Sequence, residues 1–399
     1  MNSFDETTET QTVEYEPVGV KDLLISMKDS SELIVDLAYS ALLHNSEPLA
    51  EEVLKLEQQM DRLQMQARMN MLMAARNPSD ARQLAPVLGI IGAAEKISEA
   101  AGDIASIVLG EEGLPSAIQA ALPEAIEVLA RSTVAPESPY AGRTLGDIDL
   151  ETETGVRVIG LRGEDEWDVN PDNQTTLEVG NILLLRGAEK KVSDVHETVS
   201  GESYEHPPAY SHDIQDLERA VDTIVLMKNV SELAVDLAYA SVLFDDEELA
   251  EEVHSLEIEV DGLHSRLEVW TLRAAASFDD PVELRGLLRL ASSSEMISDA
   301  ALEITEGILR DIETHPVIAE SVRESDVAVR RIEVTETSTY AGKTVGEIVA
   351  DHAGVSMIAI HEPDDDWTFY PQPDDEIEAG DVLIVRGTWN ATAELTEEV

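Results

Sequence analysis

The spacing of apolar residues predicts long amphipathic helices at the start of the chain. Between residues 49 and 74, apolar or small residues recur at alternating intervals of four and three, which places them on one face of a helix. Residues 31–43, SELIVDLAYSALL, are nearly all apolar and predict a helix that is buried on most sides. A third helix should follow the NPSD turn, with a late start or a kink at Pro86. A fourth helical stretch is expected at residues 115–129.

The hydrophobic pattern changes after these helices. VRVIGLRG (156–163) and NILLLRG (181–187) are short β-rich runs that end in glycine. The polar segment between them predicts a hairpin excursion, and RTLGDI (143–148) predicts a short helix. These elements indicate a small α+β domain of roughly 70 residues.

The whole pattern occurs twice. SELAVDLAYASVL begins 200 residues after SELIVDLAYSALL, and YAGRTLGDI from Tyr140 recurs as YAGKTVGEI from Tyr340. The offset slips by one residue, and recovers, between Thr144 and Trp167. A period of this length is too long for a solenoid repeat and indicates a duplicated module. The expected division is an acidic disordered tail (1–17), a helical domain (18–126), an α+β domain (127–197), a linker (198–214), a second helical domain (215–324) and a second α+β domain (325–399).

Asp36 is unusual because it lies in the middle of an apolar helix. An unpaired buried carboxylate costs several kcal/mol, so the residue needs a partner. One possibility is a polar or metal-binding cluster, with Glu99 or Asp103 of another helix as the candidate partners. The other is an ordinary hydrogen bond to Ser40, to Lys28 or to a neighbouring helix, or an edge position at a dimer interface.

Acidic residues also recur four positions apart on the helices, where both carboxylates of a pair share one face. If the bundle brings these pairs together, oxygen ligands would form a hard-cation site, because no cysteine or histidine belongs to them. A solvated acidic surface is the alternative. The candidate metal ligands are Glu32, Asp36, Glu57, Asp61, Glu99, Asp103, Glu232, Asp236, Glu257, Asp261, Asp299 and Glu303.

The charge balance narrows the possible partners. The chain carries 82 acidic and 27 basic residues, a net charge of −55, which is typical of proteins that work in high salt. We expect no nucleic-acid partner, because no basic stripe could neutralise phosphates.

The absence of cysteine excludes disulfides and a cysteine nucleophile. Without a bilayer-length apolar run or a signal peptide, the protein is expected to be cytoplasmic, and any membrane connection should run through a partner rather than by direct insertion.

Two family resemblances meet on these residues. SEAAGDIASIV (98–108) is similar to the Glu-x-x-x-Asp signature of the PhoU family of helical bundles, and here the pair is Glu99 and Asp103. In the second copy the acid types are reversed, at Asp299 and Glu303. The α+β part resembles the RCK C-terminal (TrkA-C) domain of potassium channel and transporter regulators. The resemblances imply a multidomain fold with two PhoU-like bundles, each followed by a TrkA-C-type α+β domain.

The resemblances also imply a function. They suggest a non-enzymatic regulatory or accessory protein of potassium- or magnesium-type cation transport, acting as a homodimer on the cytoplasmic face of a transporter or channel. A divalent metal could bind the helices, and cyclic di-AMP could bind the TrkA-C part near Ile159 and Arg162, whose counterparts are Ile358 and His361. A surface ion pair is the other explanation for Arg162. The alternatives are a PhoU-like phosphate-signalling adaptor and, least favoured, a metal-dependent enzyme.

Overall fold

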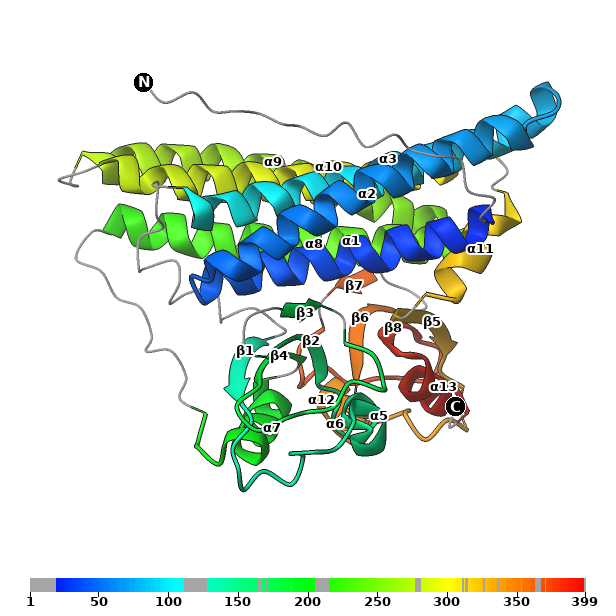
Figure 1. The fold of residues 1–399 in the computed structure, drawn as a ribbon. Coiled ribbons are helices and arrows are strands. Elements are labelled where there is room, and N and C mark those ends of the chain that lie inside the picture. The colour runs from blue at the N-terminus through cyan, green and yellow to red at the C-terminus, as the bar shows by residue number, and fades with distance from the viewer. Residues whose placement is uncertain are drawn as a thin grey trace.

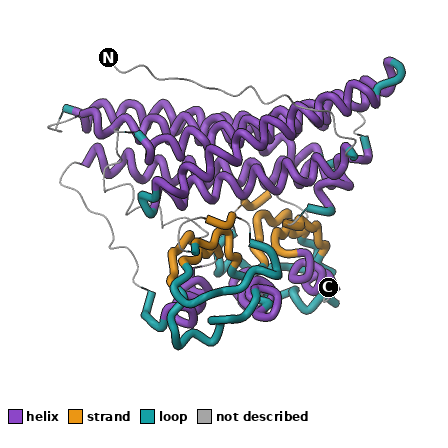
Figure 2. Tube along the Cα trace, in the orientation of Figure 1, coloured by secondary structure: helices purple, strands orange, loops and turns teal. Residues whose placement is uncertain are grey.

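A computed structural model gives the fold as two layers (Figures 1 and 2). Long helices form one layer, and two small sheets with their own short helices form the other. The described residues are 19–110, 128–163, 167–169, 171–187, 189–204, 215–276, 281–310, 312, 315–325, 327–335, 337–352, 354–362, 367–369 and 371–397. The expected tail and most of the expected linker lie outside them.

The helical layer contains the same three long helices from each copy. The first copy supplies α1 (Val20–Leu43), α2 (Glu47–Ala74) and α3 (Pro78–Leu109). The second copy supplies α8 (Gln215–Phe244), α9 (Glu247–Ala275), a short 3₁₀ turn η2 (Pro281–Leu284), α10 (Arg285–Leu309) and α11 (Pro316–Arg323).

The expected late start of the third helix is correct in one copy only. In the second copy, α10 begins at Arg285, after the 3₁₀ turn. In the first copy the late start is wrong, because α3 begins at Pro78 and continues through Pro86, and the alternative of a kink at Pro86 stays a prediction. The Asn77 side chain accepts hydrogen bonds from the amides of Ser79 and Asp80, and Pro78 occupies the first helical position that proline favours. Most of the expected helix at 115–129 lies outside the described residues, and its last residue, Leu129, belongs to a strand.

Each α+β domain is a four-stranded antiparallel sheet with the same strand order. The first has the order β1-β4-β2-β3 and the second β5-β8-β6-β7. A β-bulge follows Val158 in one sheet and Met357 in the other, so the one-residue slip between the copies is correct. The strands are β1 (Val128–Thr133), β2 (Arg157–Arg162), β3 (Trp167–Val169), β4 (Ile182–Gly187), β5 (Val327–Glu333), β6 (Val355–His361), β7 (Trp367–Phe369) and β8 (Val382–Thr388).

Short helices cover the sheet faces that point away from the bundle. The expected short helix of each copy is present, as α5 (Leu145–Ile148) and α12 (Val345–Asp351). The first domain adds α6 (Leu150–Thr154) and closes with α7 (Glu189–Ser200), and the second closes with α13 (Trp389–Glu397). Each of these faces has a small hydrophobic core of its own.

The opposite faces of the sheets belong to the large core of the helical layer. Ile159, Trp167 and Leu184 from the first sheet, and Ile358 and Ile384 from the second, are buried in the same apolar cluster as the long helices. Since this cluster is continuous, the long helices and the bundle-facing sides of both sheets share one core, in addition to the small cores on the outer faces of the sheets. A movement of the long helices would therefore act directly on the sheet residues that pack against them.

The two copies also contact each other within the chain. Helices α3 and α10 run side by side through the middle of the helical layer. The two sheet domains approach at Gly155 and Gly354, which have φ angles of +74° and +79°. A Cβ atom on Gly354 would lie 3.3 Å from the Gly155 Cα, so both the backbone angle and the close approach favour glycine there.

Candidate functional site

The partner of Asp36 is an arginine from the sheet below it. Arg186 Nη1 donates to Asp36 Oδ2, and both side chains are largely buried. Arg186 follows Leu184 by two positions on β4, so strand alternation places both residues on the face toward the bundle. The second copy repeats the contact, with Arg386 Nη1 lying 3.1 Å from Asp236 Oδ2. Each long apolar helix is thus tied to its own sheet by a buried ion pair.

The lysines of these helices bind elsewhere than expected. Lys28 pairs with Glu32 at 2.7 Å, and Lys228 pairs with Glu232 at 2.6 Å. Each ammonium group also lies over a tyrosine ring of the other copy: Lys28 is 5.1 Å from the Tyr239 ring centre, and Lys228 is 5.0 Å from that of Tyr39. These reciprocal cation–π contacts show that the two copies face each other across an approximate two-fold axis.

A cavity of about 50 Å³ lies where the two copies meet. Its volume is enough for a few water molecules. Its charged lining is four carboxylates and two guanidinium groups, and with Lys28 and Lys228 the formal charges balance. The lining residues are Ser31, Glu32, Val35, Asp36, Ile97, Arg186, Glu232, Val235, Asp236, Ile297 and Arg386.

The groups around this cavity influence one another across the two copies. Burial raises the pKa of Asp236 to about 6, although Arg386 opposes the shift. Burial would also raise the pKa of Glu32, but Lys28 and Arg386 outweigh it and hold that pKa below its usual range. Because Arg386 acts on a carboxylate from the first copy, the charge state of one copy is coupled to that of the other.

These contacts correct the expected partners of Asp36. The structure gives it Arg186 rather than Glu99 or Asp103, and Lys28 pairs with Glu32 rather than with Asp36. Sequence analysis gave Arg186 a structural role at the end of a strand but did not connect it with Asp36, because the contact joins residues 150 positions apart. The available signal was the identical spacing of Asp236 and Arg386 in the second copy.

The other acidic pairs of the first copy do converge. The carboxyl of Glu57 on α2 has a pKa raised to about 7, first by burial and then by the carboxylates of Asp61, Asp103 and Glu99. Glu57 lies over α3 at Gly102, where a Cβ atom would collide with its carboxylate. Glu95 also belongs to this first acidic cluster, and sequence analysis missed it. Such mutual repulsion favours any cation that binds between the groups.

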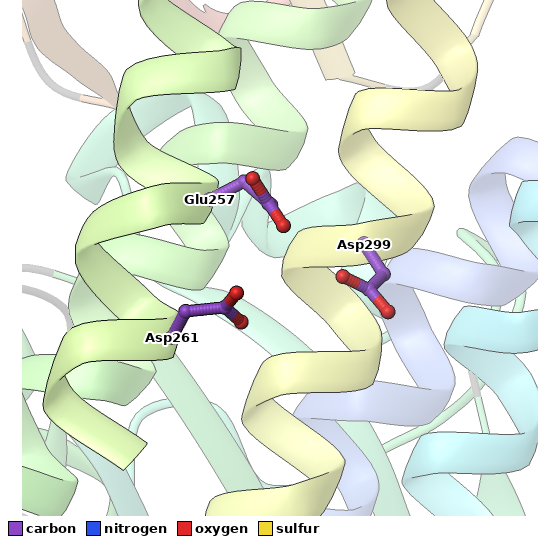
Figure 3. Close-up of side chains that lie close together, drawn as sticks. All are labelled: Glu257, Asp261 and Asp299. Atoms are coloured by element: carbon purple, nitrogen blue, oxygen red, sulfur yellow. The ribbon is translucent and has the colours of Figure 1, made fainter. Parts of the chain in front are cut away.

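The second copy forms the corresponding cluster from α9 and α10. One carboxylate oxygen from each of Glu257, Asp261 and Asp299 can be chosen so that all three lie within 4.8 Å of one another (Figure 3). Burial and the Asp261 charge raise the pKa of Glu257. Oxygen ligands at this separation suit a hard divalent cation. His264, which pairs with Glu295 beside this second acidic cluster, was not expected.

Two expected metal ligands form ion pairs between the copies. Glu303 pairs with Lys96 on α3, and Asp103 lies 3.8 Å from Arg289 on α10. These contacts join the central helices α3 and α10. Glu303 and Asp103 therefore each have a cationic neighbour from the other copy.

The expected TrkA-C ligand residues lie at the edge between sheet and bundle. Ile159 and Ile358 are only 1% and 3% exposed, and both belong to the large core. Arg162 is half-buried at the end of β2, and His361 Nε2 lies 3.8 Å from Glu248 Oε2 on α9. The burial of the isoleucines gives them a role in the core, and the binding of cyclic di-AMP stays a prediction.

Comparisons with known proteins agree with this division of the chain. The family model described as the PhoU domain matches residues 24–108 and 224–308, and the one described as the TrkA-C domain matches residues 129–200 and 329–399. No curated protein matches the chain by sequence. Within the part of the chain that the structure describes, every helix is too short or too polar to span a bilayer.

Three solved structures are similar over much of the chain. PhoU from Pseudomonas aeruginosa is 16% identical, with a TM-score of 0.41, over 73% of this chain and 96% of that chain. The GsuK RCK domain is 18% identical, with a TM-score of 0.17, over 68% of this chain and 63% of that one. The GsuK channel bound to NAD is 17% identical, with a TM-score of 0.18, over 68% of this chain and 52% of that one.

Proposed function

We propose that this chain, which belongs to the PhoU and TrkA-C families, is a cytoplasmic regulator of monoatomic cation transport. In this proposal the helical domains bind a divalent cation, and the TrkA-C domains pass the signal to the cytoplasmic face of a channel or transporter. Both families are typically regulatory rather than enzymatic, so we assign the chain no catalytic role.

The proposal rests on a series of contacts that connects the acidic clusters on the helices with the sheets. In each copy an acidic cluster lies on the second and third helices, and a buried Asp–Arg pair joins the first helix to the central strand of the sheet. A cation that neutralises the cluster would draw α2 and α3, or α9 and α10, closer together. Since α1 and α8 share a continuous core with these helices, their aspartates would move relative to the sheet arginines.

Cation flux in cells tests the proposal. A strain that lacks the protein should show altered uptake of potassium or magnesium, and the wild-type chain should restore it. A chain with Glu57→Gln and Glu257→Gln should fail to restore it, because each acidic cluster loses a carboxylate whose pKa is raised by burial and by its acidic neighbours. The matched controls are Glu51→Gln and Glu251→Gln. Both residues are exposed and precede Glu57 and Glu257 by less than two turns on the same helices. Normal flux in the deletion strain, together with altered phosphate-responsive expression, would favour a phosphate-signalling adaptor instead.

A further inference from the structure

The hairpin formed by α2 and α3 differs in charge from the rest of the chain. Residues 62–94, the first hairpin, contain four arginines and one acidic residue, a net charge of +3 in a chain of net charge −55. The charged residues are Arg62, Arg68, Arg76, Arg82 and Asp80. A local excess of positive charge on so acidic a protein gives this surface an affinity for anionic partners.

The outer face of this hairpin is apolar as well as basic. Met65, Met69, Leu72 and Met73 are spaced four, three and one residues apart, which places them along one stripe of α2. Met65, Leu72 and Met73 are 46%, 75% and 57% exposed. The buried core-facing residues of the same helix segment include Ala67 and Met71, so α2 has one apolar face in the core and a second toward solvent.

The position of the stripe suits a flat partner. Figure 1 shows the α2–α3 turn projecting beyond the rest of the helical layer, away from the sheets, so an extended surface could reach it without meeting the acidic body first. A projecting apolar ridge flanked by arginines has the features of helices that lie in a membrane interface. Arginine binds phosphate groups with two hydrogen bonds, and methionine and leucine enter the acyl boundary.

The second copy lacks this combination and supplies an internal comparison. Its equivalent segment, residues 262–294, holds four arginines and four acidic residues, with no net charge. Ser265 stands at the position of Met65, and Arg273 at the position of Met73, where its guanidinium lies 5.0 Å from the Trp270 ring centre. Leu272 is nevertheless 70% exposed, so apolar exposure alone does not distinguish the two hairpins.

We infer that the first hairpin docks on the anionic headgroup surface of a membrane, with its Met–Leu stripe in the interface and its arginines on lipid phosphates. The inference concerns peripheral contact through one helical hairpin. It replaces the expectation that any membrane connection runs only through a partner protein. It does not depend on the proposed function, because the acidic clusters and the Asp–Arg pairs take no part in it.

Vesicle flotation tests the inference. The wild-type chain should float with vesicles that contain phosphatidylglycerol and stay behind with pure phosphatidylcholine, at a salt concentration that keeps the protein folded. Arg68→Glu with Arg76→Glu should reduce the partition coefficient by roughly 25-fold or more, since each of the two arginines near an anionic surface is worth about a five-fold change. Leu72→Ser with Met73→Ser should cause a similar loss. The control, Val269→Ser with Leu272→Ser in the second hairpin, should change binding less than about two-fold.

The variants carry exposed substitutions, so unchanged melting temperatures should accompany the losses. Failure of the wild-type chain to bind anionic vesicles would overturn the inference, as would equal losses from the first-hairpin and second-hairpin variants. Sedimentation of the same proteins tests the other possible partner of the stripe, a second copy of this chain. If the first-hairpin variants break a wild-type oligomer and vesicle binding is absent, the stripe binds a second copy of this chain, and the lipid assignment is wrong.

Discussion

At the scale of single residues, the aspartate within each apolar helix is explained by the arginine opposite it. Asp36 and Asp236 are both 8% exposed, and each is paired across the boundary between helix and sheet. A buried carboxylate without a cation would be strongly destabilising, whereas a carboxylate and its partner removed together cost much less. The main effect of the ion pair is therefore to fix the position at which the sheet docks on the helix, and its net contribution to stability is small.

We predict that Arg186→Met lowers the free energy of unfolding at neutral pH by about 2–4 kcal/mol, because it leaves Asp36 buried without its cation. Adding Asp36→Asn should recover most of that loss, since the remaining side chains are both uncharged. Denaturant unfolding of the two single variants and the double variant measures the coupling. Arg162→Met, on the neighbouring strand, is the control. Additive effects of the two substitutions would contradict the ion pair.

The pKa of Asp236 predicts a pH dependence of stability. Its value of about 6 in the folded chain lies above the 3.8 of an ordinary aspartate, so the folded state binds this proton more tightly than the unfolded state does. The resulting stabilisation is complete below about pH 4 and is lost as the pH rises through 6; the shift corresponds to about 3 kcal/mol. Asp236→Asn should remove this part of the slope in unfolding measurements between pH 4 and 7. An unchanged slope would show that Asp236 is ionised throughout this range.

At the scale of helices and strands, local patterns predicted most of the fold. The long helices follow from apolar spacing, and strands β2 and β4 with the excursion between them follow from short β-rich runs that end in glycine. Strand β1 was missed, because its first residues were assigned to the expected helix at 115–129. The late start expected at Pro86 does not occur, because the cap at Asn77 and the proline at position 78 start α3 before it. The Asp36–Arg186 pair was beyond prediction because it depends on how the sheet docks on the helices, which no local pattern specifies.

The first acidic cluster depends on one glycine. Gly102 has Leu302 as its counterpart, and any side chain at 102 would displace the Glu57 carboxylate from α3. The second acidic cluster forms with Leu302 at this position, so a leucine is compatible with clustering but requires another Glu57 geometry. We predict that Gly102→Leu shifts the Glu57 carboxylate and lowers the affinity of the first acidic cluster for Mn²⁺ in a titration, while the affinity of the second is unchanged. Gly92→Ala is the control, because its added Cβ would make only an ordinary contact. Two sites of unchanged affinity in Gly102→Leu would show that Glu57 is not a ligand.

Metal binding at the first acidic cluster should release a proton. The pKa of Glu57 is about 7, so this carboxyl is about half protonated at neutral pH, and a cation must displace the proton. Affinity for Mn²⁺ should fall as the pH drops below 7, by up to about ten-fold per unit. Calorimetry in buffers with different ionisation enthalpies counts the protons released. Glu57→Gln should abolish the release, and an affinity independent of pH between 6 and 8 would contradict the assignment.

At the scale of the whole molecule, duplication places both halves of a symmetric assembly in one chain. The copies contact each other through α3 and α10, through the reciprocal lysine–tyrosine contacts and through the glycines between the sheet domains. The copies have also diverged, as the neutral second hairpin and the Leu302 counterpart of Gly102 show. A single chain allows such specialisation, because each half can change without changing the other. Pairing with a second chain stays a prediction.

The central claim is that a cation bound between the helices alters the sheets through the Asp–Arg pairs. Hydrogen–deuterium exchange of the full chain, with and without Mn²⁺ at constant ionic strength, tests it most directly. In the wild-type chain, Mn²⁺ should change exchange in α2, α3, α9 and α10 and also in strands β4 and β8. In a variant with Arg186→Met and Arg386→Met, the helices should respond as before and the strands should not. Strands that ignore Mn²⁺ in the wild-type chain, or respond equally in both proteins, would contradict the account.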